Sequence, residues 1–469
     1  MRNHQGTVWL GTALLIGALG LPAQSALATD GPAPGPGART VAGDSTAVGG
    51  RTAAPVPEPR AAAEAEEVIT FSEFPEDTAV TRQYKQRGIV FSGGGGGTPS
   101  ITTDTASPTT PVLSGSPRFQ GAVEGRFVKM DGTGRTVTRF SLDVGYIDNP
   151  GSVSVIVHDL KGKELTRKPA DRNGIVRIAV TGKGIASFRV QQTSPEGSGF
   201  AVDNVRFPRP TVLAALGDSF SSGEANPPYV AGTDIDGKGC HRSLKAWPVT
   251  LGKNNKAVDS VEHFACSGAL TTALTQEFKK EIPQLTALGR LTGAKEPRVV
   301  TLSLGGNDVG FSTILESCFV PGGTCLGKGG AVENGEKELL RLSGTLKGHY
   351  ESIQKKAPNA TVVVVGYPRL FPATDEEEDC SWLSNKERIA LNALGTKLDF
   401  VLAARAKQAG VEYVSVQETM SGHELCTVNE SWFWPVGLTG GQQRAHPLEK
   451  GQKAIEAKVR KHIDTLLKS

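Results

Sequence analysis

Two different patterns of apolar and polar residues divide the chain. Between Glu67 and Pro208, short runs of alternating apolar and polar residues are separated by Gly, Asp, Asn and Pro. The clearest runs are Val68–Phe71, Gly88–Phe91, Ser152–Val157, Ile175–Val180 and Phe200–Val205. When apolar residues recur at every second position, their side chains lie on the same face of a strand. Residues 67–208 are therefore predicted to form an antiparallel β-sandwich.

From residue 211 to residue 469, continuous apolar runs alternate with longer helical patterns. Strands are predicted over Val212–Leu216, Val299–Leu304, Ala360–Gly366 and Val411–Val416. Helices are predicted over Asn385–Ala409 and Leu448–Leu467. Strands that are apolar on both faces and alternate with helices are typical of a parallel sheet with helices on both sides. We therefore expect an α/β domain after the sandwich.

The predicted helix over Asn385–Ala409 has the clearest apolar stripe, and Gly410 is expected to end it. The stripe consists of Ile389, Leu391, Leu394, Leu398, Val401 and Leu402.

The first residues have the features of a secretory signal sequence. Arg2 precedes the apolar stretch Val8–Leu21, and Ala26-Leu27-Ala28 forms a small-residue cleavage site. Residues 1–28 are therefore predicted to be a signal peptide, although a membrane anchor is the alternative interpretation of the same stretch. Residues 29–66 are rich in Ala, Pro and Gly, which indicates a flexible linker or a processed segment. We expect a secreted, extracellular protein with no transmembrane segment.

Length, charge and cysteine content add constraints on the class of protein. A chain of 469 residues has room for two or three domains. Its formal net charge of +3 argues neither for a nucleic-acid partner nor for an anionic membrane surface, and no nucleic-acid partner is expected. All six cysteines lie in the C-terminal half. An even number of cysteines in a secreted protein favours three disulfides over a metal site, but 15 pairings are compatible with the sequence.

Candidate chemistry occurs where predicted strands end. Gly217-Asp218-Ser219 closes the run Val212–Leu216, and Gly305-Gly306-Asn307-Asp308 follows Val299–Leu304. Phe264–Gly268 forms another apparent strand end, and His446-Pro447 opens the last helical pattern. A serine at a sharp turn becomes a nucleophile when a base and oxyanion donors lie beside it.

These residues resemble the SGNH (GDSL-type) hydrolases, with Ser219, Gly268, Asn307 and His446 at the four motif positions. The resemblance covers residues 211–469. Secreted actinobacterial SGNH lipases and esterases have similar segments, which here are Gly217–Gly223, Cys240–Ser243, Ala265–Ala269 and Gly422–Cys426.

The resemblance implies a three-layer α/β/α domain with Ser219 as nucleophile and His446 as general base. The backbone amides of Ser219 and Gly268 and the side-chain amide of Asn307 are then expected to form the oxyanion hole. It also implies sequential disulfides, which pair Cys240 with Cys266, Cys318 with Cys325 and Cys380 with Cys426.

The chain departs from the family pattern three residues before the histidine, where Gln443 replaces the usual aspartate. Some secreted relatives use a backbone carbonyl at this position, so we expect a Ser-His dyad assisted by the carbonyl of Gln443. The alternative is a carboxylate from elsewhere, such as Glu424 or Glu449.

Other polar and aromatic residues are expected to be structural. Asp218 and Asp308 are expected to bond backbone amides in their turns, and Asp375–Asp379 is expected to be a solvated loop, with calcium binding as the alternative. The segment Trp432-Phe433-Trp434 is predicted either to pack in the core or to line an acyl pocket or face lipid. Structural or surface positions are expected for His241, His263, His349 and His423.

The sequence therefore predicts a monomeric extracellular lipase or esterase that acts on acyl esters, including phospholipids, and needs no metal or cofactor. Residues 67–208 resemble jelly-roll accessory modules that often bind carbohydrate, so polysaccharide is an expected partner of this region. Within it, Gly93–Gly97 is not followed by Lys-Ser/Thr and is expected to be a loop, not a phosphate site. One alternative is a carbohydrate (acetyl) esterase. The other is a catalytically silent binding protein, which is suggested by the missing aspartate at position 443.

Overall fold

The computed structural model describes residues 65–103, 111–234, 239–320, 322–373, 383–436 and 441–467. The expected signal peptide (residues 1–28) and all but the last two residues of the expected linker (residues 29–66) lie outside the described residues. In the described ranges, no helix is both long enough and apolar enough to cross a membrane.

Two antiparallel sheets make up the first part of the described chain. One contains, in spatial order, β3 (Ser100–Thr102), β4 (Val112–Ser114), β11 (Ala201–Pro208), β6 (Val137–Ile147) and β9 (Gly174–Ile185), with β1 (Glu66–Ile69) paired to β11. The other contains β2 (Ile89–Gly93), β5 (Val123–Phe127), β10 (Ser187–Gln192), β7 (Val153–His158) and β8 (Glu164–Pro169). Two short 3-10 turns, η1 (Lys85–Arg87) and η2 (Gly94–Gly96), flank β2, and the second confirms a turn in the glycine tract.

The alternation of side chains accounts for these strands. In β9, Val176, Ile178 and Val180 are buried while the residues between them are exposed. The five runs expected as strands correspond to β1, β2, β7, β9 and β11. The other six strands were not predicted, in part because β3 and β4 are only three residues long and because the edge strand β8 has no buried residue.

A parallel sheet forms the second part, with the strand order β13 (Ser260–His263), β12 (Val212–Gly217), β14 (Pro297–Ser303), β15 (Thr361–Val365) and β16 (Glu412–Val414). Every residue of β12 and β15 is buried. The continuous apolar runs in the sequence follow from this burial on both faces.

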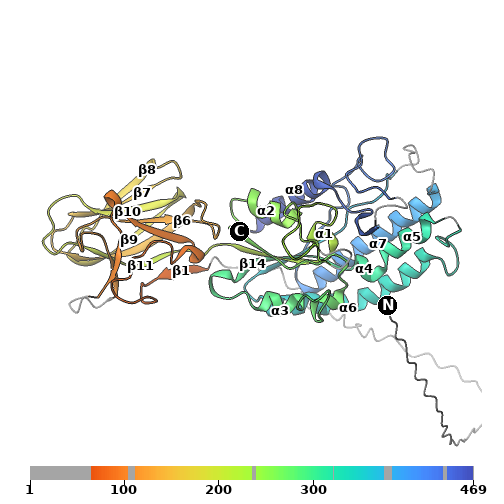
Figure 1. The fold of residues 1–469 in the computed structure, drawn as a ribbon, viewed down its shortest axis with the longest axis horizontal. Coiled ribbons are helices and arrows are strands. Elements are labelled where there is room, and N and C mark those ends of the chain that lie inside the picture. Colours follow the sequence, from red (N-terminus) through yellow and green to blue (C-terminus); the bar gives the residue numbers. More distant parts are fainter. Residues whose placement is uncertain are drawn as a thin grey trace, which may run out of the picture. The chain divides into compact units, whose positions relative to one another are not determined.

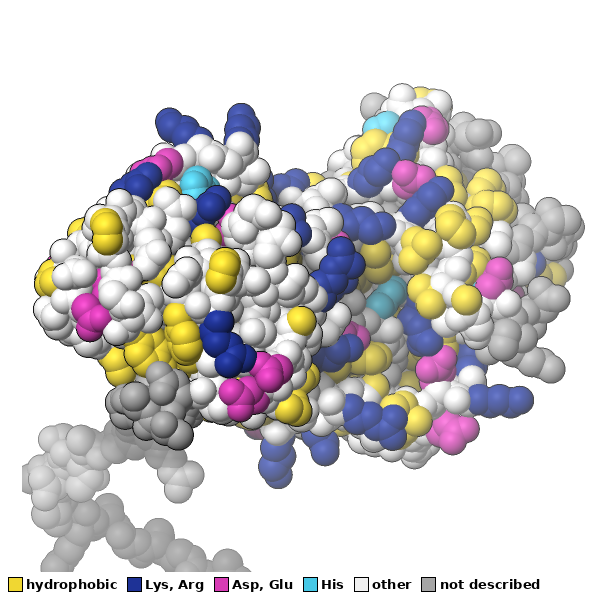
Figure 2. All heavy atoms as spheres, turned by 60° about the vertical axis from the view of Figure 1, so that its left-hand side comes forward, with side chains coloured by type: hydrophobic (Ala, Val, Ile, Leu, Met, Phe, Trp, Pro, Cys, Tyr) yellow, Lys and Arg dark blue, Asp and Glu magenta, His cyan; other side chains and the backbone are white. Residues whose placement is uncertain are grey.

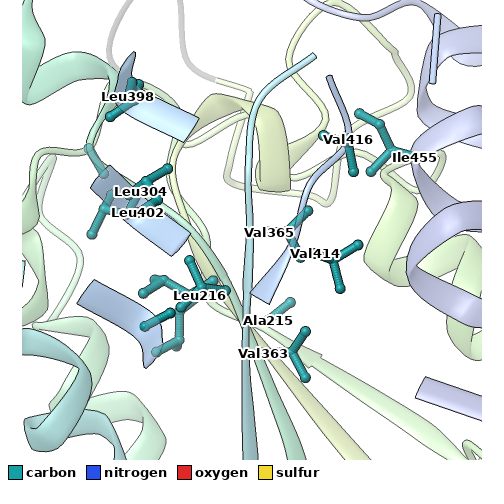
Figure 3. Packing of buried hydrophobic residues seen from close by; sticks show 14 of the residues in the cluster. Ala215, Leu216, Leu304, Val363, Val365, Leu398, Leu402, Val414, Val416 and Ile455 are labelled. Carbon is teal, nitrogen blue, oxygen red and sulfur yellow. The ribbon is translucent and has the colours of Figure 1, made fainter. Parts of the chain in front are cut away.

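Helices cover both faces of the parallel sheet. On one side α6 (Ala331–Lys356) packs against α7 (Asn385–Ala409), and on the other α2 (Trp247–Asn254) packs against α8 (Glu449–Leu466) (Figure 1). Figure 3 shows Leu216, Leu398 and Leu402 on one side of the sheet, and Ala215, Val416 and Ile455 on the other. The shorter helices are α1 (Ser219–Ser222), α3 (Gln284–Gly289), α4 (Gly306–Val309) and α5 (Phe311–Phe319), with the 3-10 turns η3 (Thr271–Leu274), η4 (Gly293–Lys295) and η5 (Gly441–Gln443).

Helix α7 has the bounds that the sequence predicted. Ser384 caps it in a capping box with Glu387, and Gly410 ends it in the left-handed conformation. Leu391, whose side chain is buried, begins the apolar stripe, whereas the prediction that Ile389 belongs to it is wrong because Ile389 is 57% exposed. Two residues turn a helix by about 200°, so these two side chains point to opposite sides.

Two of the expected disulfides are present, Cys240–Cys266 and Cys318–Cys325. Cys380, the expected partner of Cys426, lies outside the described residues. Cys240–Cys266 is next to Ser267, whose backbone N–H donates to the Cys240 carbonyl. The bridge therefore holds the turn that contains Gly268.

We predict that breaking Cys240–Cys266 destabilises the protein more than breaking Cys318–Cys325. The first bridge spans 26 residues and the second 7. Loop-closure entropy then gives about 3.5 and about 2.4 kcal/mol respectively. Denaturant unfolding of Cys240→Ser with Cys266→Ser, compared with the matched pair Cys318→Ser with Cys325→Ser, measures the difference. A larger loss in the second pair would contradict this ranking.

Candidate active site

Ser219 lies where β12 leaves the sheet. Gly217 has φ of +126°, and a Cβ atom there would come within 2.4 Å of the Ser303 carbonyl oxygen. The next backbone N–H, of Asp218, donates to that same oxygen at 2.9 Å. The chain can therefore turn sharply only with glycine at this position, and Ser219 becomes the first residue of α1.

The strand order explains why this turn faces other polar residues. β12 is flanked by β13 on one side and β14 on the other, so the chain direction across the sheet reverses at β12. Open parallel sheets form a crevice at the carboxyl ends of the strands at such a point. Ser219 follows β12 and Asn307 follows β14, and both line one pocket with His446.

His446 contacts Ser219 directly. Its Nε2 lies 2.7 Å from Ser219 Oγ, and its Nδ1 lies 3.3 Å from the carbonyl oxygen of Gln443. Burial lowers the pKa of His446, while the charge of Glu224 and nearby backbone carbonyls oppose this shift. A neutral imidazole that donates from Nδ1 to the carbonyl has its Nε2 lone pair free to accept from the serine hydroxyl.

The loop before His446 is held by backbone pairing with the aromatic segment. Ala445 N–H donates to the Trp434 carbonyl, and Trp434 N–H donates to the His446 carbonyl. Ala445 has φ of +56°, a conformation that costs free energy for a residue with a side chain and is often found at active sites. Phe433 is buried in the core, and none of the three aromatic residues lines the pocket. Core packing is therefore confirmed for Phe433, with Trp432 partly buried against the same core.

Asn307 and Gly268 approach each other through the turn after the disulfide. Asn307 Nδ2 donates to the Ala269 carbonyl at 3.0 Å, and Cys266 N–H donates to the Gly217 carbonyl at 3.0 Å. Gly268 has φ of +81°. As the first residue of α1, Ser219 has a backbone N–H without an acceptor in its own helix.

Asp218 and Asp308 bond backbone amides, as the sequence predicted. Asp218 accepts from Phe220 N–H at 3.0 Å and from the Tyr367 hydroxyl at 2.6 Å, and Asp308 accepts from Thr271 N–H at 3.0 Å. Burial raises the pKa of Asp218 to about 7, against the lowering effect of the hydrogen bond from Tyr367.

Two residues that the sequence did not single out brace the strand ends. Tyr367 donates to Asp218 and accepts from Gly306 N–H at 3.0 Å, so it links the segments after β12 and β14. Gln284 accepts from Gly217 N–H at 2.8 Å and donates to the Gly217 carbonyl at 2.9 Å. Both contacts join residues far apart in sequence, and no local pattern predicts them.

Glu224 is the third missed residue, and it connects the loops around the histidine. Its carboxylate is fully buried and accepts from His241 Nδ1 at 2.8 Å, Ser267 Oγ at 2.5 Å and Gln442 Nε2 at 3.1 Å. These donors come from the residue after Cys240, the turn with Gly268 and the loop with Gln443. The one signal in the sequence that could have identified Glu224 is its position directly after the motif segment Gly217–Gly223.

The structure gives other partners to the carboxylates considered as alternatives to Gln443. Glu424 lies 3.4 Å from Arg369 Nη2, and Glu449 pairs with Lys245 and Lys453. The acidic run Asp375–Asp379 lies outside the described residues.

The remaining histidines have structural contacts. His241 stacks on Tyr229 and bonds Glu224, and His263 Nε2 bonds the Ser221 carbonyl at 3.0 Å. Burial lowers the pKa of His263 to about 4, so the ring is neutral and donates to that carbonyl. His423 stacks on Trp432.

The pocket beside Ser219 is mainly apolar. Its apolar lining residues are Phe220, Phe311, Leu315, Leu370, Leu391 and Leu398. Arg369 and Arg444 also line it, and each faces a carboxylate, Glu418 at 2.7 Å and Glu316 at 3.4 Å. The apolar lining residues therefore lie in the same pocket as Ser219 and His446.

Comparison with known proteins agrees with this geometry. The model of the GDSL-like Lipase/Acylhydrolase family matches residues 215–454. Lipase 1 of Streptomyces coelicolor is 36% identical over 51% of this chain and 81% of its own length. A lipase of Streptomyces rimosus is 32% identical over 52% of this chain and 82% of its own length.

Among solved structures, an extracellular lipase from Streptomyces rimosus is 28% identical over 55% of this chain and 99% of that chain, with a TM-score of 0.46. The family model covers half of this chain, and the first relative shares more than a third of the aligned residues. The chain therefore belongs to the GDSL-like Lipase/Acylhydrolase family, and it is a carboxylic-ester hydrolase.

Proposed function

We propose that the protein is a secreted lipase or esterase that hydrolyses acyl esters through a covalent intermediate on Ser219. The observation that carries this proposal is the 2.7 Å contact between Ser219 Oγ and His446 Nε2 inside an apolar pocket. A serine hydroxyl becomes a strong nucleophile when an adjacent base takes its proton during attack. Secretion is supported by the disulfides and by the apolar stretch Val8–Leu21.

The reaction begins when Ser219 Oγ attacks the ester carbonyl carbon and His446 Nε2 takes the hydroxyl proton. Asn307 Nδ2 carries two hydrogens, of which one donates to Ala269 and the other is available for the oxyanion. The backbone amides of Ser219 and Gly268 supply the remaining donors. Collapse of the tetrahedral intermediate breaks the ester C–O bond, and His446 gives its proton to the leaving alcohol.

The second half of the reaction returns the enzyme to its starting state. His446 Nε2 takes a proton from water, whose oxygen attacks the acyl carbon. The proton then passes to Ser219 Oγ as the acid leaves. Throughout, the carbonyl of Gln443 holds Nδ1–H, so it fixes the tautomer without adding a negative charge beside the ring.

The apolar lining supports an acyl chain as the group bound next to Ser219, because each buried methylene contributes about 0.8 kcal/mol to binding. A carbohydrate esterase remains the second candidate, and the region before residue 211 motivates it. We also propose that residues 67–208 and 211–469 are separate domains, since their buried apolar side chains form two separate clusters.

We predict that Ser219→Ala and His446→Ala each lower kcat by about 10⁴-fold or more, because nucleophile and base act as a unit. Hydrolysis of short and long acyl esters, a phospholipid and an acetylated polysaccharide measures the loss and identifies the preferred substrate. Ser312→Ala is the matched control, since Ser312 lines the same pocket. A serine-directed fluorophosphonate should label the wild-type protein and not Ser219→Ala. Equal labelling of both would exclude Ser219 as the nucleophile, and no labelling of the wild-type protein would favour a silent binding protein.

The dyad mechanism predicts that Gln443→Ala keeps near-normal activity, because alanine retains the backbone carbonyl that faces Nδ1. Glu424→Gln and Glu449→Gln are expected to be equally mild. Initial rates with one ester compare these variants with His446→Ala. If either glutamate variant loses as much activity as His446→Ala, a carboxylate assists the histidine and the carbonyl-assisted dyad is wrong.

We propose that Glu224 positions the histidine loop and stabilises the imidazolium from a distance. His446 must be neutral to act as a base, and its lowered pKa places the acidic limb of kcat/KM below about pH 6.5. Glu224→Gln removes a negative charge that raises the pKa of His446, so this limb should move to still lower pH. We also expect kcat at the optimum to fall on the order of tenfold, because an amide cannot accept from every donor around it.

The measurement for Glu224 is the pH profile of kcat/KM. Glu336→Gln is the control, since Glu336 is paired with Lys397 at the surface. A purely structural role would lower activity without moving the acidic limb, so an unmoved limb refutes the electrostatic part of this role.

A further inference from the structure

A second cleft lies in the antiparallel part of the chain and shares no lining residue with the active-site pocket. Its volume is about 720 Å³, and its walls come from β2, β5 and β10 and from the loops around residues 81–85, 131–132 and 158–162. Nothing in the proposed hydrolysis uses these residues.

The floor of the cleft is the outward face of a sheet. Cross-strand pairing aligns Val90, Arg126, Ser187 and His158 in one row, and Ser92, Glu124 and Arg189 in the next. The aromatic neighbours Phe91 and Phe188 are buried in the core. The cleft therefore has a polar floor, and its lining has no exposed aromatic ring.

Cations outnumber carboxylates in this lining, with Arg82, Lys85, Arg126 and Arg189 against Glu124 and Asp131. Glu124 already pairs with Arg189 at 3.2 Å, and Asp131 accepts from Thr133 N–H at 2.8 Å. Arg82, Lys85 and Arg126 have no ion pair within 4 Å among the residues that the structure describes, although the charge of Lys85 helps to lower the pKa of Asp131.

Glycines make room for two of the cations. A Cβ at Gly94 would lie 2.7 Å from Arg189 Nη2, and a Cβ at Gly132 would lie 3.1 Å from Lys85 Cε. Arg189 lines the cleft and its side chain is partly exposed, so its outer N–H groups can donate to a bound carboxylate.

We propose that this cleft binds a carboxylated polysaccharide, one that contains uronic acid units. The unpaired cations suit its carboxylates, while Ser92, Ser187, Glu124 and Asp131 can bond its hydroxyl groups. A polyphosphate or nucleic acid has no hydrogen-bond donors along its backbone, so it would bring negative charge next to Glu124 and Asp131 without bonding them. A lipid surface would require exposed apolar side chains around the cleft. On the face shown in Figure 2, Lys and Arg side chains are scattered among neutral ones, whereas a nucleic-acid site needs a continuous basic field.

Calorimetric titration of the full-length protein with oligogalacturonate tests the proposal, with a neutral cello-oligosaccharide of equal length as the comparison ligand. We expect measurable binding of the first alone, weakened by added NaCl because charge pairing contributes to it. Arg126→Gln with Arg189→Gln should weaken binding by roughly tenfold or more. Arg172→Gln, an exposed arginine of the same region outside the cleft, should bind as the wild type does.

Ester hydrolysis by every variant is measured in parallel and is expected to be unchanged, so a failure here is distinguishable from a failure of the proposed catalytic function. Because Arg189 pairs with Glu124, Arg126→Gln alone provides a second variant that breaks no ion pair among the described residues. Equal binding of both sugars, no binding of oligogalacturonate, or unchanged binding by both variants would overturn the proposal. Tighter binding of DNA or of anionic vesicles would assign the cleft to another class of ligand.

Discussion

The close approach of Gly217 to the Ser303 carbonyl determines where Ser219, the proposed nucleophile, is placed. A side chain at position 217 would collide with that oxygen. Because Gly217 has none, the backbone can pass close to the end of β14 and turn at once into α1. The strand order then puts this turn at the crevice of the sheet, next to the segment that carries Asn307. Gln284 and Tyr367 fix the same strand ends with direct hydrogen bonds. Ser219 is thus positioned by backbone contacts that do not depend on its own side chain.

Electrostatics around His446 differ from those of a triad with a carboxylate at Nδ1. In the proposed dyad, the carbonyl of Gln443 orients the ring but compensates little of the charge that forms on proton transfer. Burial makes that charge still less favourable, since it lowers the pKa of the ring. Glu224 opposes this effect through space, and its hydrogen bond with Gln442 places it one residue from the orienting carbonyl. In a triad, one carboxylate both orients the histidine and compensates its charge. In our proposal, the carbonyl of Gln443 orients the ring and Glu224 compensates the charge.

Local sequence patterns predicted the features that depend on local interactions. The bounds of α7 follow from its capping residues and its apolar period, and Ser219 was identified because a buried strand ends beside it. Glu224, Gln284 and Tyr367 were missed because their partners are separated by many residues and meet only through the strand order. The edge strand β8 was missed for a different reason, since a strand with no buried residue has no apolar alternation to detect. Ile389 shows the opposite error, an apolar residue that the helical geometry leaves in solvent.

The two pockets recognise their ligands by different physical means, and this limits how they can cooperate. The pocket at Ser219 is lined mainly by apolar side chains, so its affinity grows with the apolar area that a substrate buries. The proposed polysaccharide cleft relies on charge pairing, which salt weakens. Binding at a remote site raises the local concentration of an ester only when that ester belongs to the bound polymer. For a lipid substrate, the cleft would instead determine where the enzyme resides, and kcat would not depend on it.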